Sequence, residues 1–430
     1  MRVLFTVFAS RTHMYNMVQL AWALRSSGHE VCVAGQPDLV DMIATTGLSA
    51  VPVGKALTSG SDGWRGRGMQ NLDVLSRGLA APHEEQRDGG WEYVLGEWTM
   101  ACGVRYESLG DQHMVDDLVK FARTWEPDLV VWDAMTFAGP VAAIACGAAH
   151  ARMNFGRDYI YRLYQDYVAL RDKQPPEQRD DPLEDWFTGR LARIGHEYDP
   201  SMAKEMLTGQ WTIDPLPEWL RVPTDLPSVH ASYVPYNGRI TISDWVYRKP
   251  EVPRVCLSFG VSLREHVGGA IVSIEDMLGA VADLDIEVIA TLDASQVDPA
   301  AVPDNVTLVG FVSLNELMPS CSVAVHQGGY GTYSNALVHG VPSLIIPHPF
   351  WDEAECGVLF EERGAGLCLT PEEFTPEAFR EKLVRLLEEP HFRRTALELR
   401  QEIHDAPKPL DVVSRLEQLT AQHRGRDTQG

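Results

Sequence analysis

The sequence predicts an α/β protein built from two successive units, each an open parallel sheet with helices on its faces. Short apolar runs alternate with segments of helical spacing over residues 1–225, and the same alternation begins again at residue 254. The chain has 430 residues, and domains of roughly 150 residues leave room for two to three of them. Apolar residues make up 45% and charged residues 23%, which excludes wholesale disorder.

The first unit opens with a strand, helix and strand. Residues 3–8 and 30–34 are short β-rich runs, and Gly28 marks the end of the helix between them. That helix is predicted from apolar residues at helical spacing, namely Met14, Met17, Val18, Ala21 and Leu24. Further on, residues 129–132 predict a buried parallel strand, and the small residues of 138–145 predict a closely packed helix.

Three segments interrupt or end this alternation. Residues 58–110 are rich in Gly, Trp and charge without a clean period, and they predict an insertion of irregular structure and helices. Residues 173–182, KQPPEQRDDP, predict an exposed loop. Pro and Gly break any period across 234–253. We therefore expect an N-terminal domain over 1–233 and a linker over 234–253.

The second unit is expected over residues 254–405. Its apolar, strand-like runs are residues 254–260, 286–293, 305–312, 321–326 and 342–347. Segments of helical pattern, such as 274–284 and 332–339, separate them. The tail predicts two helices broken at 406–409, so that 406–430 forms a last helix and a terminal tail.

Composition and charge exclude several functions. The chain has 37 Lys and Arg against 60 Asp and Glu, a net charge of −23, and no basic run. Nucleic acid and anionic membranes are therefore poor partners. Its seven cysteines show no C-x-x-C pair or metal-like spacing, and no apolar stretch reaches the length of about 18 residues that spans a membrane. A cytoplasmic protein with reduced thiols is the expectation.

The most informative motif is HQGGYGTYSNALVHG, which begins at His326. A strand is predicted to end at His326 and a helix to begin near Tyr330, so that the positive helix end faces whatever lies beyond the strand. A diphosphate suits this arrangement, because His326 can donate a hydrogen bond and Thr332 offers a hydroxyl. Room for its close approach comes from Gly328, Gly329 and Gly331. A plain Gly-rich turn is the alternative.

The motif resembles the donor-binding signature of nucleotide-sugar glycosyltransferases of the GT-B fold, in the branch that decorates macrolide and aromatic polyketide antibiotics. The resemblance covers nearly the whole chain, through MRVLFTVFASRTHMYNMVQLAWALRSSGHEV, PDLVVWDAMTFAGPVAA, GQWTIDPLPEWLR, VPYNG, RVCLSFGVS and LVGFVSLNELMPSCSVAVHQGG. GQWTIDP is specific to enzymes that transfer TDP-activated deoxysugars and aminosugars. The resemblance implies two Rossmann-like domains facing each other across a cleft, with the C-terminal helix returning to the N-terminal domain.

The chain departs from the family pattern at a few positions. Many members have two consecutive His where this chain has His326 and Gln327, and Pro or Ala where Tyr330 stands. Plant relatives read sugar hydroxyls with Asp-Gln, whereas Asp352 is followed here by Glu353. Loss of that Gln is what a deoxysugar, with fewer hydroxyls, would permit.

The resemblance implies further donor-binding residues in the second unit. They are Ser258, Gly260 and Ser262 for the pyrophosphate and nucleoside, Phe311 and Val312 for the pyrimidine base, and Trp351, Asp352 and Glu353 for the sugar. Each has a structural alternative. The residues from Ser258 to Ser262 could form a tight polar turn, Phe311 could belong to the core, and Asp352 could be a helix N-cap.

His13 is the candidate catalytic base. It follows the first strand in ASRTH, just before the first helix, so its imidazole is expected at the carboxyl end of the sheet, facing the cleft. A neutral His there can take the proton of an attacking hydroxyl. Asp133 aligns with the carboxylate that bonds this His in related enzymes and would fix its tautomer. A solvent-facing His and a capping Asp are the alternatives.

The N-terminal domain of this family builds the acceptor pocket. The insertion holds Trp64, Trp91, Tyr93 and Trp98, which suit a large apolar aglycone, although a core role for each is as plausible. Members with GQWTIDP often require a cytochrome-like auxiliary protein that binds this region, and we expect such a partner here. A homodimer is compatible with the resemblance.

The sequence therefore predicts an inverting GT-B glycosyltransferase that moves a TDP-activated deoxysugar, with an aminosugar favoured, to a hydroxyl of a polyketide aglycone. His13 would be the base and Asp133 its orienter. No D-x-D pair lies in a suitable loop, which favours a reaction without metal or other cofactor. A sugar-nucleotide epimerase and a non-catalytic sugar-nucleotide-binding helper remain alternatives. An NAD-dependent oxidoreductase is disfavoured, because no G-x-G-x-x-G follows the first strand.

Overall fold

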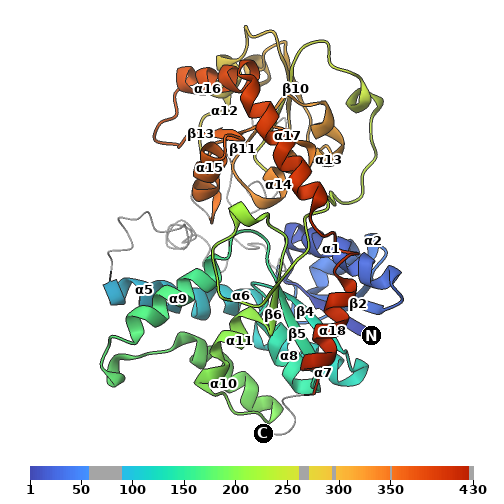
Figure 1. The fold of residues 1–430 in the computed structure, drawn as a ribbon, viewed down its shortest axis with the longest axis vertical. Coiled ribbons are helices and arrows are strands. Elements are labelled where there is room, and N and C mark those ends of the chain that lie inside the picture. The colour runs from blue at the N-terminus through green and yellow to red at the C-terminus, as the bar shows by residue number, and fades with distance from the viewer. Residues whose placement is uncertain (58–89, 261–270, 293–296, 349–350, 426–430) are drawn as a thin grey trace. The chain divides into compact units, whose positions relative to one another are not determined.

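Parallel strands form two separate sheets, and the chain divides into two units around them (Figure 1). The structure is a computed structural model that describes residues 1–57, 90–260, 271–292, 297–348 and 351–425. The first unit comprises Met1–Leu216, Arg221–Ser232 and Pro407–Gly430, and the second comprises Pro217–Leu220 and Tyr233–Ala406. The predicted architecture of two Rossmann-like α/β units is confirmed.

The first sheet has the strand order β3-β2-β1-β4-β5-β6-β7, with every pairing parallel. Its strands are β1 Arg2–Thr6, β2 Glu30–Gly35, β3 Ser49–Pro52, β4 Leu129–Asp133, β5 Ala149–Met153, β6 Trp211–Asp214 and β7 Ser228–His230. The order reverses between β1 and β4, and ligands of such sheets bind beyond the carboxyl ends of the strands at this switch point.

Helices flank the first sheet. They are α1 Arg11–Ser26, α2 Val40–Thr45, α5 Gly90–Met100, α6 Glu107–Leu109, α7 Gln112–Trp125, α8 Ala138–Cys146, α9 Tyr159–Arg171, α10 Pro182–Ile194, α11 Ala203–Thr208 and α18 Val413–His423. The predicted apolar face of α1 is buried, with Met14 and Leu24 wholly inaccessible. The helix nevertheless begins at Arg11, earlier than predicted, so His13 lies in its first turn rather than in the loop before it.

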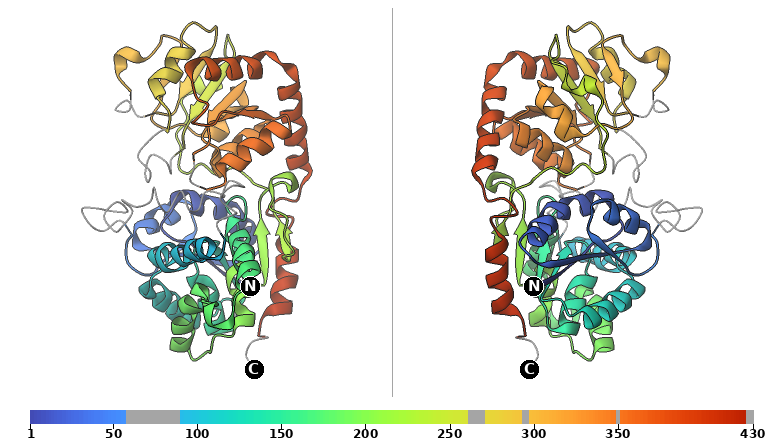
Figure 2. Two further views of the ribbon diagram at one scale, coloured as in Figure 1. Left: turned by 90° about the vertical axis from the view of Figure 1, so that its left-hand side faces the viewer. Right: turned by 90° about the vertical axis from the view of Figure 1, so that its right-hand side faces the viewer.

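The last helix packs on the first unit, as the resemblance implied (Figure 2). Glu417 of α18 forms an ion pair with His29 at 3.0 Å, and His423 contacts the ring of Trp211 in β6. The preceding helix ends at Asp405, close to the predicted break. The chain therefore returns to its first unit after completing the second.

The second sheet has the order β10-β9-β8-β11-β12-β13, again with every pairing parallel. Its strands are β8 Arg254–Ser258, β9 Glu287–Ala290, β10 Val306–Leu308, β11 Val323–His326, β12 Ser343–Ile345 and β13 Gly366–Cys368. Its helices are α12 Ile274–Ala280, α13 Leu314–Leu317, α14 Tyr330–His339, α15 Glu353–Glu362, α16 Pro376–Glu388 and α17 Pro390–Asp405. The switch point of this sheet lies between β8 and β11.

Alternate residues of the central strands bury opposite faces of the second sheet. Val255 of β8 and Val325 of β11 pack with Met277 of α12 in one core, whereas Cys256 of β8 packs with Ala336 of α14 in another. Strands buried on both faces read as continuous apolar runs, which is the pattern that predicted them.

Other predicted segments have the following structures. Residues 234–253 belong to the second unit and contain one helical turn, Asp244–Tyr247. Residues 173–182 are largely exposed around a short turn, Pro176–Gln178. Of the insertion at 58–110, residues 58–89 lie outside the described part of the chain. The remainder is helical and includes a π-helical segment, Ala101–Tyr106.

The seven cysteines, all within the described ranges, are free. The helices that the structure describes include none long and apolar enough to cross a membrane. The same described residues contain no group of three or more His, Cys, Asp or Glu side chains that could hold a metal ion.

Candidate active site

Two predicted residues meet at the switch point of the first sheet. His13 lies in the first turn of α1, directly after β1, and Asp133 is the last residue of β4. The His13 Nδ1 atom is 2.7 Å from Asp133 Oδ2. The His13 side chain is 14% exposed and that of Asp133 is 1% exposed, so a buried carboxylate orients a partly exposed imidazole.

Asp133 forms a turn as well as the bond to His13. Its Oδ1 accepts a hydrogen bond from the Met135 N–H at 3.0 Å, while its Oδ2 faces His13. Asp133 does not cap α8, because that helix begins at Ala138 and its N-cap residue is Phe137. Asp133 instead closes a short turn and keeps one oxygen for the imidazole.

The Asp133 bond also determines the chemistry of the His13 ring. A carboxylate only accepts, so Nδ1 carries the proton and Nε2 of the neutral ring presents its lone pair. Phe8 and Phe155 contact the ring, with centroid distances of 4.6 and 4.2 Å. Two aromatic neighbours and one carboxylate thus hold a ring whose free nitrogen can take a proton.

The second sheet also brings predicted residues together at its switch point. Ser258 ends β8 and His326 ends β11, and the two are register partners in adjacent parallel strands. The Ser258 Oγ accepts a hydrogen bond from Thr291 Oγ1 at 2.9 Å, so this hydroxyl is tied into the sheet edge. Ser262 lies outside the described residues.

The His326 side chain is wholly buried and neutral. Burial lowers the pKa of His326 to about 3. Its Nδ1 accepts a hydrogen bond from the Gly328 N–H at 3.0 Å, which places the ring proton on Nε2. Within the described part of the chain, that buried Nε2 has no hydrogen-bond partner. A buried donor without a partner is costly, and a bound anion would satisfy it.

Gly328 and Gly260 are positions that only glycine suits. Gly328 has a φ of +93°, and a Cβ there would lie 2.9 Å from Glu353 Cβ. Gly260 has a φ of +74°, and its Cβ would lie 2.6 Å from the Gln327 amide nitrogen. A Cβ on Gly329 would meet the same amide at 2.7 Å. The turns after β8 and β11 therefore pack together, with the Gln327 side chain between them.

The helix after this turn begins as predicted. Gly329 occupies the N-cap position of α14, and Tyr330 is its first residue. Thr332 is buried in the first turn, where its N–H donates to the Gly329 carbonyl at 2.9 Å. A Cβ on Gly331 would meet no atom within 4 Å, so this glycine borders open space.

Trp351, Asp352 and Glu353 lie at the start of α15 and are buried. Asp352 occupies the N-cap position, but its side chain makes no capping hydrogen bond. Glu353 Oε2 instead accepts the Trp351 N–H at 2.7 Å, and the Glu353 stem packs on Gly328. The predicted sugar-binding residue Glu353 thus touches the predicted phosphate loop.

The buried Glu353 carboxyl makes stability depend on pH. Burial and the nearby Asp352 carboxylate raise the pKa of Glu353 from 4.5 to about 8. The stability contribution of this group is therefore fully present below pH 4.5 and is lost as the pH rises through 8. We expect Glu353→Gln to melt at a higher temperature than the wild type at pH 9 and to lose this advantage at pH 5.

Differential scanning calorimetry at several pH values measures this effect. The matched control is Glu362→Gln, at an exposed position of the same helix. A melting-temperature difference between Glu353→Gln and the wild type that is equal at pH 5 and pH 9 would contradict the prediction.

The two predicted base-binding residues differ in burial. Phe311 is 51% exposed, so it is not a core residue. Val312 packs against the core that contains Cys256 and Ala336. Both follow β10 at the same edge of the sheet as Ser258 and His326, but β10 is separated from β8 by β9.

The aromatic residues predicted for an acceptor pocket differ in burial and in packing. Trp98 is wholly buried and packs on Tyr164 and Tyr167, which favours its core interpretation. Trp91 and Tyr93 are partly buried on α5, and Trp91 stacks on Tyr167. Trp64 lies outside the described residues.

Three residues of these sites were not predicted, and the first is Phe8 of the loop after β1, which contacts the His13 ring. Phe155 contacts His13 from the loop after β5, and Gln327 lies between the two glycine turns. The available signal was positional, because Phe155 comes shortly after a strand end and Gln327 directly follows one. Their side chains gave no indication of a role.

Two Rossmann-type sheets, with a His–Asp pair at one switch point and a His and glycine turn at the other, define a glycosyltransferase of the GT-B fold. The chain belongs to the erythromycin biosynthesis protein CIII-like family. The N-terminal domain model of that family matches residues 22–260, and its C-terminal domain model matches residues 275–419.

Individual relatives agree with this assignment. The chain is 45% identical to 10-deoxymethynolide desosaminyltransferase of Streptomyces venezuelae, over 99% of this chain and 98% of that protein. It is 44% identical to aclacinomycin-T 2-deoxy-L-fucose transferase of Streptomyces galilaeus, over 99% and 97%. The crystal structure of the glycosyltransferase VinC in complex with dTDP matches with a TM-score of 0.85 and 38% identity, over 98% of this chain and 100% of that chain.

Proposed function

We propose that this enzyme transfers a TDP-activated deoxysugar to a hydroxyl group of a polyketide aglycone, with inversion at the anomeric carbon. The observation that carries the proposal is the 2.7 Å contact between His13 Nδ1 and Asp133 Oδ2 at the switch point of the first sheet. It leaves the Nε2 lone pair to act as a base. An epimerase has no need of a base for an acceptor hydroxyl.

The proposed reaction is a single displacement. His13 Nε2 takes the proton of the acceptor hydroxyl while its oxygen forms a bond to the anomeric carbon. The bond from that carbon to the diphosphate oxygen breaks, and the electron pair leaves with TDP. Attack from the face opposite the leaving group inverts the configuration. Asp133 stabilises the imidazolium that forms.

The second unit supplies the donor-binding groups in this proposal. His326 Nε2–H would donate to a diphosphate oxygen, and the N-terminus of α14 would offset the charge that develops on the leaving TDP. Ser258, Gly260, Gly328, Gly329, Gly331 and Thr332 would surround the diphosphate, and Ser262 is proposed from the sequence alone. Phe311 and Val312 would hold the pyrimidine base of TDP. The sugar would be bound by Trp351, Asp352 and Glu353. We propose that transfer needs no metal or other cofactor.

Removal of the His326 side chain should weaken donor binding. A hydrogen bond to a charged group contributes about 1.5–3 kcal/mol, so we expect the Kd of TDP for His326→Ala to rise about 10- to 100-fold. Isothermal titration calorimetry measures it. The control is His339→Ala, because His339 lies at the other end of α14 and bonds Asn315. Equal TDP affinity in His326→Ala and the wild type would remove His326 from the donor site.

The substrate classes rest on the relatives. One relative is a desosaminyltransferase and another a 2-deoxy-L-fucose transferase, and the solved VinC structure contains dTDP. We therefore propose a TDP-deoxysugar as the donor of this enzyme and a polyketide aglycone as its acceptor. Among deoxysugars, an aminosugar is the favoured donor. A cytochrome-like auxiliary protein on the N-terminal unit and a homodimer remain proposals.

A mass-spectrometric turnover assay tests the function. The enzyme is incubated with a panel of TDP-deoxysugars and macrolide or anthracycline-type aglycones, with and without a candidate auxiliary protein. A product heavier by one deoxysugar is expected. Consumption of donor without aglycone would favour an epimerase, and intact TDP binding without any turnover would favour the helper subunit.

A further inference from the structure

The GQWTIDP segment, residues 209–215, has no role in the sites described so far. It forms β6, Trp211–Asp214, which lies beside β5 in the first sheet. The loop that follows β5 begins at Asn154 and reaches Asp158, where α9 starts. That loop contains Phe155, the residue in contact with the His13 ring. The segment and the base are therefore separated by one loop.

The first end of the loop is held at Asn154. Its N–H donates to the Ile213 carbonyl of β6 at 3.0 Å, and its carbonyl accepts from Asn16 Nδ2 of α1 at 2.7 Å. Its side-chain amide is 3.5 Å from Asp214 Oδ2. Asp214 is itself fixed, because its Oδ1 accepts the Leu216 N–H at 2.9 Å. The residue directly before Phe155 is thus bonded to β6 on one side and to the helix of His13 on the other.

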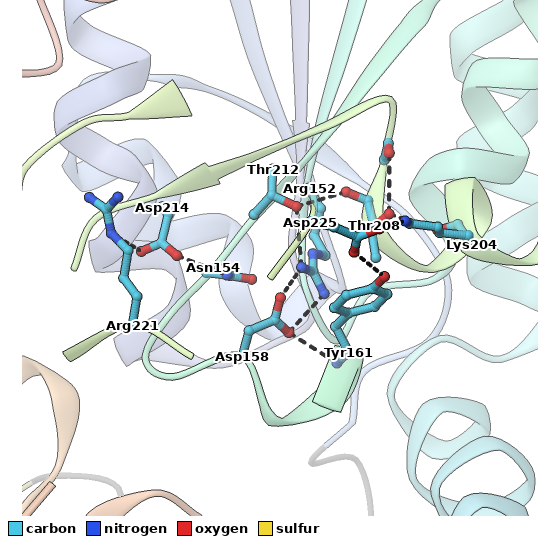
Figure 3. Close-up of polar contacts among 11 residues, drawn as sticks. Arg152, Asn154, Asp158, Tyr161, Lys204, Thr208, Thr212, Asp214, Arg221 and Asp225 are labelled. Atoms are coloured by element: carbon cyan, nitrogen blue, oxygen red, sulfur yellow. Dashed lines mark hydrogen bonds and ion pairs between the residues drawn. The ribbon is translucent and has the colours of Figure 1, made fainter. Parts of the chain in front are cut away.

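The second end of the loop is held at Asp158. Figure 3 shows the wholly buried Arg152 side chain of β5 between Asp158 and Thr212 of β6. Arg152 donates to both Asp158 oxygens and, at 3.2 Å, to Thr212 Oγ1. Thr212 Oγ1 in turn donates to the Thr208 carbonyl at 3.0 Å. A buried charge pair with these additional bonds resists movement, because any displacement leaves charge unpaired.

Phe155 lies between these two fixed ends. It contacts the His13 ring at a centroid distance of 4.2 Å, and Phe8 contacts the same ring at 4.6 Å. The bond to Asp133 fixes only the Nδ1 atom, and a ring held at one atom can still swing about that bond. Aromatic neighbours restrict this motion, so they determine where Nε2 points.

We propose that Phe155 is a positioning residue for His13, and that the GQWTIDP segment holds Phe155 in place through Asn154 and the Arg152–Asp158 pair. The proposal rests on the proposed function, in which His13 is the base. Phe155 acts through His13 and takes no proton itself.

Kinetics of Phe155 variants provide the first test. Misplacement of a catalytic group by about 1 Å can cost about 100-fold in rate. We expect Phe155→Leu to lower kcat about tenfold and Phe155→Ala about 100-fold, with the KM for the TDP-sugar unchanged. Phe155→Tyr keeps the ring and should retain most of the wild-type kcat. Phe155 is only partly buried, so these variants are expected to fold.

NMR of the His13 ring provides a readout that a merely stabilising role would not change. In histidine-labelled enzyme, the His13 ring signals are identified by their loss in His13→Gln. Phe8 also contacts this ring and stays in place in the Phe155 variants, so nuclear Overhauser contacts between the His13 and Phe8 rings report the orientation of the imidazole. These contacts should weaken in Phe155→Leu, because the ring can then swing about the bond to Asp133, and they should persist in Phe155→Tyr.

The role of the segment is tested by Thr212→Val, which removes the acceptor for Arg152 while keeping the side-chain shape. We expect kcat to fall several-fold, and the double variant with Phe155→Leu to be no slower than Phe155→Leu alone, because both act on one step. The control is Asp225→Asn. Asp225 is exposed and bonds Tyr161 and Lys204 at the far end of the same network (Figure 3).

The outcomes separate this proposal from the proposed function. If His13→Ala is inactive while Phe155→Ala keeps the wild-type kcat, the positioning role is overturned and the base remains. A lowered melting temperature in Phe155→Leu, with unchanged kcat and unchanged contacts between the His13 and Phe8 rings, would show that Phe155 only stabilises the fold. If His13→Ala keeps wild-type activity, His13 is not the base, and the part of the proposed function on which this inference rests has failed. Additive effects of Thr212→Val and Phe155→Leu would overturn the link to GQWTIDP.

Discussion

Replacement of His13 by Ala should lower kcat about 1,000-fold, because general base catalysis contributes about 10²- to 10⁴-fold. The variant loses the Nε2 lone pair that takes the acceptor proton. Binding of TDP should be unchanged, because the proposed donor site belongs to the second unit. Steady-state kinetics with a TDP-deoxysugar and its aglycone measure the first effect, and calorimetry measures the second.

His113→Ala is the matched control for this prediction. His113 is an exposed histidine of the same unit, near Lys55, and its removal should leave kcat unchanged. A His13→Ala enzyme with nearly wild-type kcat, or one that has lost TDP binding as well, would contradict the assignment of His13 as the base.

Replacement of Asp133 by Asn should also lower kcat by about 10³-fold. The Asn oxygen can still accept the Met135 N–H, which Asp133 Oδ1 now accepts at 3.0 Å. Its amide nitrogen would then face His13 Nδ1 and donate to it. The imidazole must respond by moving its proton to Nε2, which removes the lone pair that acts as base. In serine proteases the corresponding change of tautomer costs about 10⁴-fold.

The same variant can be checked without turnover. The ¹⁵N chemical shifts of the His13 ring distinguish the two tautomers, and we expect the Nε2-protonated form in Asp133→Asn. The melting temperature should change little, because the turn is preserved. An Asp133→Asn enzyme with wild-type kcat would show that the carboxylate does not orient a base.

Much of the fold was predictable because buried parallel strands are continuous apolar runs. The run at 129–132 becomes β4, Leu129–Asp133, and 321–326 ends with β11 at His326. Strand β5 was missed because its sequence, AHARM, contains two polar residues. Both are buried and bonded to residues distant in the sequence, His150 to Glu205 and Arg152 to Thr212. Local pattern cannot reveal such pairing.

The candidate sites were predictable where a residue follows a strand. His13, Asp133, Ser258 and His326 each lie at or after a strand end, and parallel topology gathers such ends at one edge of the sheet. The contact between Gly328 and Glu353 depends on how α15 packs on the phosphate loop. The contact between Phe155 and His13 depends on buried bonds between β5 and β6. Neither follows from the spacing of residues along the chain.

Direct displacement at the anomeric carbon of a TDP-deoxysugar fixes the anomeric configuration of the product, which can be measured. The purified product is analysed by NMR, and the coupling between the anomeric proton and its neighbour gives the configuration. A single displacement gives a product of opposite anomeric configuration to the donor. A product with retained configuration would contradict single displacement with His13 as the base.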